Sequence, residues 1–334
     1  MSSSFDPEGP QTFHQGLVFK KSQGTYFVRA DHRTLPCAIS SRLRKVLIYP
    51  TAAPTSLHHR VKEVREIKSV DPVAVGDLVH FTDAGDGSGL ITEVLPRRNQ
   101  LARLHAGPKP LEQVIVANVD HVVAVMAAAN PAPKWGLLDR YLATAEVAGI
   151  PTLITLTKTD LNSEDALVAE LENYQQLGYA VALTSTVTGV GLEAFKAALA
   201  GRVSVLVGKS GVGKTSLLNA VQPGLGLRVK DVNRSTGKGK HTTAHLEMFD
   251  LDLGGQVVDT PGMREFGLWK LADADLAYGF VEMRPYLGAC KFSADCVHDH
   301  EPGCAIKAAV EAGQIALRRY QSYLKMRADQ DAEN

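Results

Sequence analysis

A glycine-rich stretch at 208–216, GKSGVGKTS, has the residue types and the spacing of a phosphate-binding loop. The pattern Gly208-x-x-x-x-Gly213-Lys214-Thr215 follows an apolar run, VSVLV, and precedes a helical run, TSLLNAV. Glycines let the backbone wrap phosphates, so that successive N–H groups and the helix N-terminus point at the negative charge. We expect Lys214 to reach the β- and γ-phosphates and the Thr215 hydroxyl to ligate magnesium. The alternative is a strand-to-helix turn without a ligand, which this context disfavours.

A second motif, Thr157-Lys158-Thr159-Asp160, follows the apolar run LITL and matches the guanine-recognition signature Asn/Thr-Lys-x-Asp. Asp160 can accept hydrogen bonds from guanine N1–H and its amino group, whereas adenine offers neither in that arrangement. A carboxylate left unpaired by the wrong base gives about 10⁴-fold discrimination. The Lys158 stem would lie along the base, and Ser185, which ends a later strand, would support guanine from the other side. Alone, the motif is more often a solvated Lys/Asp pair after a strand; the phosphate loop in the same chain favours guanine.

The segment VVDTPGMREFG, downstream of the phosphate loop, places Asp259 at the end of a strand. This order is typical of the loop that holds magnesium through water and offers the Gly262 N–H to the γ-phosphate. Between the two lies a polar stretch at 235–244, STGKGKHTTA, in which either Thr242 or Thr243 would be the switch residue that senses the γ-phosphate. In isolation DTPG would be an ordinary turn.

The sequence therefore predicts a guanine-nucleotide site with magnesium at Thr215 and Asp259. The residues predicted to bind the nucleotide are Thr157, Lys158, Thr159, Asp160, Ser185, Gly208, Lys209, Ser210, Gly211, Val212, Gly213, Lys214, Thr215, Ser216, Thr242, Asp259 and Gly262. The base motif precedes the phosphate loop by about fifty residues, the reverse of the usual order. A circular permutation explains this order, because strands and helices can keep their spatial positions when the chain is cut and rejoined elsewhere.

A cysteine cluster near the C-terminus reads Cys290-x5-Cys296-x-His298-x5-Cys304. Three thiolates and one imidazole are the ligand set of a closed structural zinc site, although a group of reduced, partly buried cysteines is the alternative. His300 competes with His298 for the imidazole position. The remaining cysteine, Cys37, is expected to be a small buried residue.

Length and composition bound the elements that must position these residues. A chain of 334 residues exceeds one hydrophobic core, and its 45% hydrophobic and 22% charged residues are typical of a globular protein. No secretory signal or membrane-spanning run is evident, so we expect a cytoplasmic protein that does not contact membranes. Net charge is zero, yet residues 1–110 carry 15 Lys/Arg against 10 Asp/Glu.

Two patterns follow one another along the chain after a mobile tail at 1–12. Short alternating segments, GLVF, TYFVRA, KVLIYP at 45–50, DLVHFT and GLITEVL, predict a small β-barrel over 13–108, with an oligonucleotide-binding barrel and any other small barrel about equally favoured. Apolar strands then alternate with amphipathic helices over 109–272, which predicts a mostly parallel α/β sheet. The zinc-binding region at 273–334 is predicted to be mostly helical and to contain one long helix, AIKAAVEAGQIALRRYQSYLKMRA.

These segments together resemble the circularly permuted GTPases, and specifically the ribosome small-subunit-dependent GTPase A family. The resemblance covers about 13–325 and is carried by VAVGDLV, NVDHVVAV, LDRYL, TKTDL, GKSGVGKTSLLN, GKHTT, DTPGMREFGL and the cysteine cluster. It implies an oligonucleotide-binding-type barrel, GTP/GDP with Mg²⁺, one structural Zn²⁺, and a bacterial cytoplasmic role in late maturation of the small ribosomal subunit with contact to its rRNA. We expect a monomer. Thr157 stands where many GTPases have Asn, so one polar contact that supports guanine is changed.

The residues expected to act in hydrolysis are Lys214, Thr243 and His241. Many GTPases place a Gln after the glycine at 262 to orient the attacking water, whereas this chain has Met263. We therefore expect slow turnover that the small subunit stimulates by ordering the segment that carries His241, although a histidine that merely sits on a mobile loop is an equal alternative. Basic residues of the barrel region are candidates for phosphate contacts: Arg42, Arg44, Lys45, Arg97 and Arg98.

Two other functions compete with a ribosomal GTPase. A P-loop kinase of a small metabolite would leave the TKTD motif and the barrel unexplained. A nucleotide-gated RNA-binding module with incidental hydrolysis would show salt-dependent RNA binding without turnover.

Overall fold

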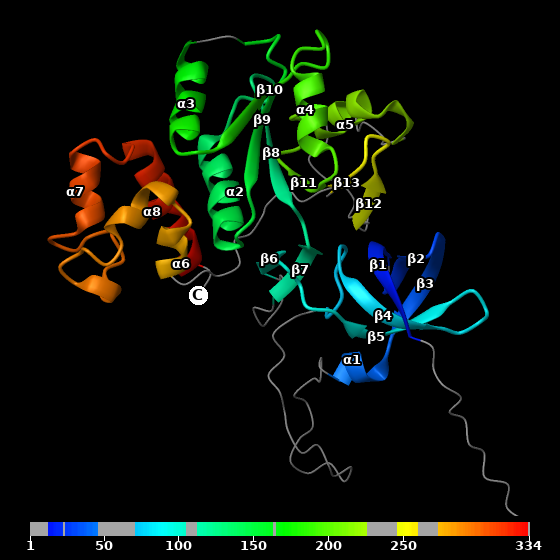
Figure 1. The fold of residues 1–334 in the computed structure, drawn as a ribbon. Helices are drawn as coiled ribbons and strands as arrows, with labels where there is room; N and C mark the ends of the chain where they lie inside the picture. Colours follow the sequence, from blue (N-terminus) through cyan, green and yellow to red (C-terminus); the bar gives the residue numbers. More distant parts are fainter. Residues whose placement is uncertain are drawn as a thin grey trace, which may run out of the picture. The chain divides into compact units, whose positions relative to one another are not determined.

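The computed structural model describes residues 13–22, 24–45, 71–104, 112–162, 165–225, 246–259 and 273–332. The chain divides into two compact units, of which the first ends at residue 118 and also takes in the start of strand β12. The second unit begins at residue 119 and contains the remaining strands and helices (Figure 1). No helix of the described residues is long and apolar enough to cross a membrane.

The first unit contains a five-stranded barrel, as the sequence predicts. Its strands run in the order β1-β2-β3-β5-β4, and pairing of β1 with β4 closes it. The strands are β1 (Phe13–Ser22), β2 (Thr25–Ala30), β3 (Arg33–Ile39), β4 (Leu78–Asp83) and β5 (Gly89–Val94), with a short helix α1 (Ser41–Lys45) after β3. Alternate residues face inward, and the most buried strand residues are Val18, Val28, Cys37, Val79, Phe81 and Ile91, each at most 2% exposed.

The strand predicted at 45–50 is not the third strand of this barrel. Lys45 ends α1, and 46–50 lie outside the described residues. The third strand is β3, which sequence analysis misses because Pro36 interrupts it and proline argues against a strand interior. In the structure Pro36 faces outward opposite Phe27 of β2, while its neighbours Leu35 and Cys37 are buried.

A hairpin of β6 (Gln100–Leu104) and β7 (Glu112–Ala117) follows the barrel in the same unit. The VAVGDLV segment contacts it closely, because Val75 forms a bridge with Val116. Gly76 has φ +90°, and a Cβ atom there would lie 2.1 Å from the carbonyl oxygen of Ala117. Only glycine permits this approach, which explains why the motif carries one.

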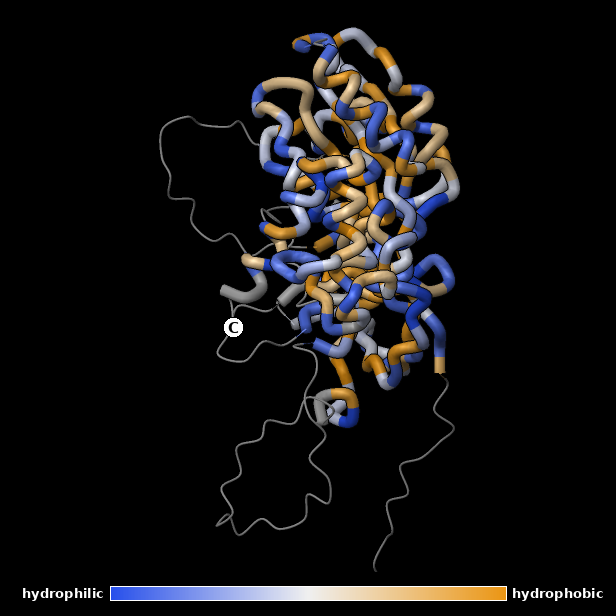
Figure 2. The backbone as a smooth tube through the Cα atoms, turned by 90° about the vertical axis from the view of Figure 1, so that its left-hand side faces the viewer, coloured by the Kyte–Doolittle hydropathy of each residue, from blue (hydrophilic) through white to orange (hydrophobic). Residues whose placement is uncertain are grey.

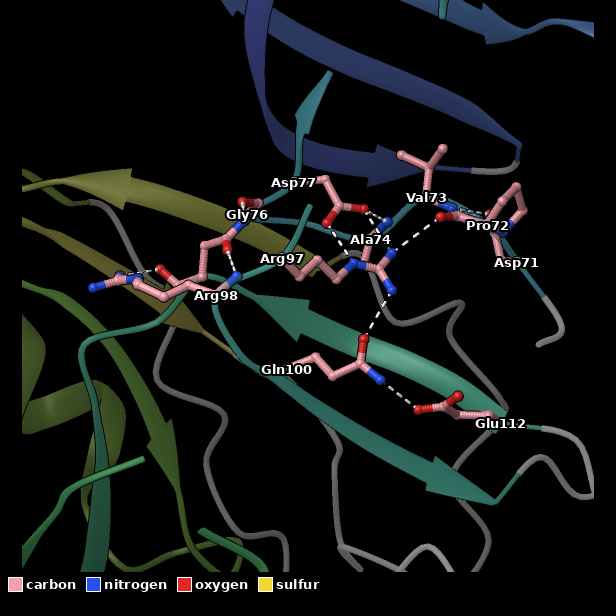
Figure 3. A network of polar contacts seen from close by, with 11 residues as sticks. Asp71, Pro72, Val73, Ala74, Gly76, Asp77, Arg97, Arg98, Gln100 and Glu112 are labelled. Atoms are coloured by element: carbon pink, nitrogen blue, oxygen red, sulfur yellow. Dashed lines mark hydrogen bonds and ion pairs between the residues drawn. The ribbon is translucent and has the colours of Figure 1, made fainter. Parts of the chain in front are cut away.

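A polar network joins the same segment to the hairpin (Figure 3). The guanidinium of Arg97 donates to both carboxylate oxygens of the fully buried Asp77, at 2.7 and 2.8 Å. Arg97 also donates to Gln100 Oε1 at 2.9 Å, and Gln100 donates to Glu112 at 2.6 Å. The positive charge of Arg97 is thus paired with the buried carboxylate of Asp77 inside the unit.

The second unit is built on a mostly parallel sheet of strand order β10-β9-β8-β11-β13-β12. The strands are β8 (His121–Ala127), β9 (Thr152–Thr157), β10 (Ala180–Leu183), β11 (Val203–Val207), β12 (Leu246–Asp250) and β13 (Gln256–Asp259). All residues of β8 and β9 are buried, as expected for parallel strands covered on both faces. In Figure 2 the tube through the middle of this unit is largely orange, the colour of hydrophobic residues.

Helices cover both faces of the sheet. They are α2 (Trp135–Val147), α3 (Asp165–Gln176), α4 (Leu192–Leu199) and α5 (Lys214–Val221), followed by the 3-10 turn η1 (Pro223–Leu225). Phe195 of α4 and Leu217 of α5 pack with Val123 and Val125 of β8 in one apolar cluster. Helices α2 and α3 lie together on the other side of the sheet (Figure 1). This alternation confirms the predicted α/β sheet.

The C-terminal part of the second unit is mostly helical, as predicted. Its elements are α6 (Asp273–Tyr278), α7 (Ala305–Glu311) and α8 (Leu317–Ala332), with the 3-10 turns η2 (Val281–Tyr286) and η3 (Ser293–Asp295). The prediction of one long helix from residue 305 is wrong. The chain turns at Gly313, whose φ is +72°, and the N–H groups of Gln314 and Ile315 both bond to the carbonyl of Ala309. A left-handed glycine of this kind ends a helix, so α7 and α8 are separate.

Candidate nucleotide site and metal cluster

The predicted phosphate loop lies between the end of β11 and the start of α5. Three of its glycines have positive φ: +150° at Gly208, +84° at Gly211 and +97° at Gly213. A Cβ atom at Gly208 would lie 2.3 Å from the carbonyl oxygen of Val125 on β8, so the loop presses against the neighbouring strand. These backbone conformations favour glycine and produce the strand–loop–helix geometry that the Walker pattern predicts.

Lys214 lies over this loop from the first turn of α5. Its Nζ atom donates to the carbonyl oxygen of Gly208 at 2.5 Å and to that of Lys209 at 3.1 Å. The positive charge therefore sits beside the backbone that would surround phosphates. Thr215 and Ser216 follow in the same turn and are half-buried, Val212 is buried, and Ser210 is exposed.

The predicted guanine motif meets the phosphate loop directly. Thr157, the last residue of β9, donates its hydroxyl to the carbonyl of Val212 or to that of Met126, which lies at 3.1 Å. Lys158 adopts φ +58° and donates from Nζ to the carbonyl of Gly211 at 2.8 Å and to that of Asn130. Sequence analysis did not identify Asn130, because it contributes a backbone carbonyl, which every residue type has.

The carboxylate of Asp160 is held by the second predicted segment. Ser185 donates its hydroxyl to Asp160 Oδ1 at 2.5 Å, and the same hydroxyl accepts the N–H groups of Val187 and Thr188. The backbone N–H of Thr159 bonds to the carbonyl of Thr184 at 3.3 Å. Ser185 is fully buried whereas Asp160 is exposed, so the carboxylate has a fixed position and still faces solvent.

The segments predicted to sense the γ-phosphate are only partly described. Asp259 is the last residue of β13, which pairs in parallel with β11 and so ends at the same edge of the sheet as the phosphate loop. Gly262, Met263, His241, Thr242 and Thr243 lie outside the described residues. Their predicted roles stay predictions.

The cysteine cluster is brought together as its spacing predicts. Ligand atoms of Cys290, Cys296, His298 and Cys304 all lie within 4.8 Å of one another, and all four residues are buried. The Sγ atoms of Cys290 and Cys304 lie 3.4 and 3.5 Å from Nδ1 of His298. His300 is exposed and does not belong to the cluster.

Two of these thiols are buried in a way that disfavours their charged form. Burial raises the pKa of Cys296 to about 12 and also raises that of Cys304, which opposes thiolate formation. Three buried thiols around one imidazole are compatible with zinc, because the metal supplies the positive charge that makes thiolates stable. Cys37, by contrast, is buried in the barrel, where burial and the charge of Asp83 raise its pKa to about 11.

The basic residues proposed for phosphate contacts are not equivalent. Arg97 pairs with Asp77, so the prediction that it tracks phosphates is wrong for this side chain. Arg98 is exposed and donates from Nη2 to the carbonyl of Asn118 at 3.0 Å. Arg42 is exposed on α1, and the side chains of Arg44 and Lys45 are outside the described residues.

Comparison with known proteins gives a consistent result. A family model described as RsgA GTPase matches residues 94–269. A protein named small ribosomal subunit biogenesis GTPase RsgA from Gemmatimonas aurantiaca is 45% identical over 257 residues, covering 76% of this chain and 83% of that protein. The crystal structure of YjeQ from Thermotoga maritima has a TM-score of 0.70 at 33% identity and covers 96% of this chain and 99% of its own. That of YloQ, described as a circularly permuted GTPase, has a TM-score of 0.65 at 27% identity, covering 98% and 99%.

Proposed function

The chain belongs to the RsgA GTPase family, and on that premise we propose that it hydrolyses GTP in the biogenesis of the small ribosomal subunit. One observation carries this proposal. Thr157 and Lys158 contact the carbonyls of Val212 and Gly211, so the base motif and the phosphate loop meet although their order in the chain is reversed. A single nucleotide can then contact both segments.

We propose that each predicted residue has the role its position supports. The backbone of the loop from Gly208 to Gly213 and the ammonium of Lys214 bind phosphate oxygens. Asp160, fixed by Ser185, accepts the guanine N–H groups. Thr215 and Asp259 hold Mg²⁺, which shields phosphate charge when bound. Residues 13–108, 109–272 and 273–334 are the proposed barrel, GTPase and zinc-binding domains.

Hydrolysis transfers the γ-phosphoryl group to water and releases GDP. The bond from phosphorus to the β,γ-bridging oxygen breaks while a bond to the water oxygen forms, and Lys214 stabilises the negative charge that builds up. Met263 can neither donate nor accept a hydrogen bond usefully, so the intrinsic rate is slow. We propose that the small subunit orders the segment containing His241 and Thr243, and that His241 then orients the water.

Zinc is the metal that the cysteine cluster suits. Cys290, Cys296, His298 and Cys304 would fill all four positions of a tetrahedral ion, which leaves none for a substrate. The ion therefore supplies folding energy and no chemistry. Its loop is braced by Glu301, which accepts the N–H groups of Val297 and Asp299 at 2.7 and 2.9 Å.

We propose that the barrel contacts rRNA of the small subunit. Its outer face carries an aromatic and basic group in which the Arg29 guanidinium lies 4.7 Å from the Phe19 ring centroid and Phe27 lies 6.5 Å from Phe19. Half-exposed aromatic rings with adjacent cations favour stacking with single-stranded bases. We propose that the protein acts as a monomer in the cytoplasm.

The proposal is tested by GTP turnover with and without purified small ribosomal subunits, for the wild type and for His241→Ala. We expect slow turnover of the wild type alone, strong stimulation by subunits, and a weaker stimulation of His241→Ala. Absence of stimulation in the wild type would exclude the ribosomal switch, and equal stimulation of both proteins would remove His241 from the mechanism. ATP competing equally with GTP would favour a kinase, and RNA binding without turnover would favour the RNA-binding module.

A further inference from the structure

Helix α8 is hydrogen-bonded to the loop that carries His298, one of the proposed metal ligands. Tyr320 donates its hydroxyl to the carbonyl of His298 at 2.7 Å, and Tyr323 donates to that of Val297 at 2.8 Å. Both tyrosines are buried, at 9% and 0% exposure. The position of α8 is therefore tied to the shape of the ligand loop, which depends on the metal that its ligands surround.

The same helix is also bonded to α2, which lies on the sheet, through Arg318 and Arg319. Arg319 donates to Asp139 Oδ1 at 2.7 Å, and Arg318 donates to Asp139 Oδ2 at 2.8 Å. Arg319 is also paired with Glu282 through two bonds of 2.6 and 2.9 Å. Tyr174 of α3 donates to Asp139 as well, at 2.6 Å. Asp139 is fully buried, and Arg319 is 3% exposed.

This group of charges makes α2 depend on α8. Burial alone would lower the pKa of Arg319, but Glu282 and Asp139 hold it well above its ordinary value, so the guanidinium stays charged. A buried carboxylate that loses its cationic partners is strongly destabilised. If α8 moves away, Asp139 loses both arginine partners, and movement of its carboxylate toward water would displace the start of α2.

The start of α2 leads to the guanine end of the nucleotide site. Trp135, its first residue, has its ring 6.0 Å from the ring of Tyr174 and 6.0 Å from the Arg318 guanidinium. The loop that precedes it contains Asn130, whose carbonyl accepts the ammonium of Lys158. Hydrogen bonds and packed side chains therefore connect His298 with Trp135, and the backbone of residues 131–134 connects Trp135 with Asn130 and its contact to Lys158.

We infer that α8 couples the metal cluster to the guanine site, with Arg319 and Asp139 as positioning residues, so that metal occupancy regulates nucleotide affinity. The inference depends on the proposed guanine-nucleotide site and on the proposed zinc. It goes beyond a purely local structural role for the metal. Because coupling is reciprocal, bound nucleotide should also slow the loss of metal to a chelator.

The test compares the metal-loaded full-length chain with the same chain after chelation. We measure the dissociation constant of a fluorescent GDP analogue and hydrogen exchange of the α2 amides. Chelation should weaken nucleotide binding about fivefold or more, a typical value for coupled sites, and should speed exchange in α2. Exchange in the central strands β8 and β9 should stay slow, which separates this effect from global unfolding.

Two variants separate coupling from general destabilisation. Arg319→Met removes the bond between α8 and Asp139 of α2. In the metal-loaded state the α2 amides should therefore already exchange hydrogen faster, and chelation should change nucleotide affinity less than twofold. Lys325→Met removes an exposed cation from the same helix and should retain the full wild-type response. Tyr320→Phe with Tyr323→Phe should also reduce the response of nucleotide affinity to chelation, but α2 should exchange as slowly as in the wild type because the Asp139 pair stays in place.

The outcomes distinguish this inference from the proposed function. If the loaded wild type does not bind the GDP analogue, the proposed function fails, and α2 exchange still decides the coupling. If chelation speeds exchange only around the cysteine cluster and leaves α2 and the nucleotide affinity unchanged, the inference is overturned. An equal response to chelation in Arg319→Met and Lys325→Met would also overturn it.

Discussion

The ammonium of Lys158 donates to the carbonyl of Gly211 at 2.8 Å, across 53 positions of the chain. In this contact the end of β9 meets the loop after β11, with only β8 between these strands in the sheet. Spatial neighbours are thus preserved although the chain passes through them in a permuted order. The adjacent Thr157 makes a second contact of the same kind, through its side-chain hydroxyl.

Replacing Thr157 with Val should weaken binding of GDP and GTP. The substitution keeps the shape of a side chain that is 3% exposed but removes the hydroxyl that bonds to the phosphate-loop carbonyl. A lost hydrogen bond of this kind costs about 1 kcal/mol, or about fivefold in affinity, measured by fluorescence titration. Thr155→Val is the matched control, because Thr155 lies on the same strand, is fully buried and has no hydrogen-bond partner for its hydroxyl among the described residues. Equal nucleotide affinities of the two variants would contradict a role for the Thr157 hydroxyl in holding the phosphate loop.

Replacing Arg97 with Met should destabilise the barrel unit. The fully buried carboxylate of Asp77 would lose its bidentate partner, which costs about 3 kcal/mol. Arg33→Met is the control, since its contact with Asp83 spans 3.5 Å with an arginine side chain that is 62% exposed. That pair contributes less than about 1 kcal/mol. Chemical denaturation of the isolated variants measures both, and similar losses would refute a structural role for Arg97.

Stability of the sheet unit should fall on acidification because of His121. Burial, and secondarily the nearby Arg202, lower the pKa of His121 from 6.5 to about 4 against a smaller opposing effect of Asp120. Between these values the unfolded chain binds a proton that the folded chain does not. The contribution is therefore complete above pH 6.5 and is lost as the pH falls toward 4.

The size of this effect follows from the same shift. Between pH 7.5 and pH 5 the wild type should lose about 2 kcal/mol more than His121→Leu, in which no group titrates at this position. Denaturant unfolding of both proteins at the two pH values isolates the difference, because all other titrating groups are shared. Parallel pH dependence of the two proteins would show that folding does not lower the pKa of His121.

Removal of Cys296, a proposed metal ligand, should release zinc. The purified wild type should contain about one zinc per chain, and Cys296→Ser should contain much less, because three ligands hold the ion weakly. Cys37→Ala should keep its zinc, since Cys37 belongs to the barrel. Elemental analysis decides the matter: a metal-free wild type would rule out the zinc site.

Sequence patterns predicted the site better than they predicted its supports. The phosphate loop and the cysteine cluster depend on residues near in sequence, and both assemble as their spacing indicates. The pair of Asp139 and Arg319 spans 180 positions, and although Asp139 lies in the segment LDRYL, no sequence pattern indicates Arg319 as its partner. Arg97 is predicted to contact phosphates for a similar reason, since only the fold brings it to Asp77.

Local exceptions account for the remaining errors. Strand β3 is missed because proline within a run argues against a strand. Pro36 is nevertheless tolerated in β3, where it faces outward. Gly313 splits a run that is otherwise helical in periodicity, because a left-handed residue and two bonds to one carbonyl stop α7. Backbone conformation decides both cases.

Nucleotide choice by Asp160 is the most direct test of the account. We propose measuring hydrolysis of GTP and of xanthosine triphosphate by the wild type, by Asp160→Asn and by Asp252→Asn, an exposed aspartate of the same unit. The asparagine amide would donate to the carbonyl that xanthine carries in place of the guanine amino group. The wild type and Asp252→Asn should prefer GTP, and Asp160→Asn should prefer xanthosine triphosphate, with the ratio of kcat/KM values changing by about 10² or more. An unchanged preference for GTP in Asp160→Asn would contradict a guanine site at this position.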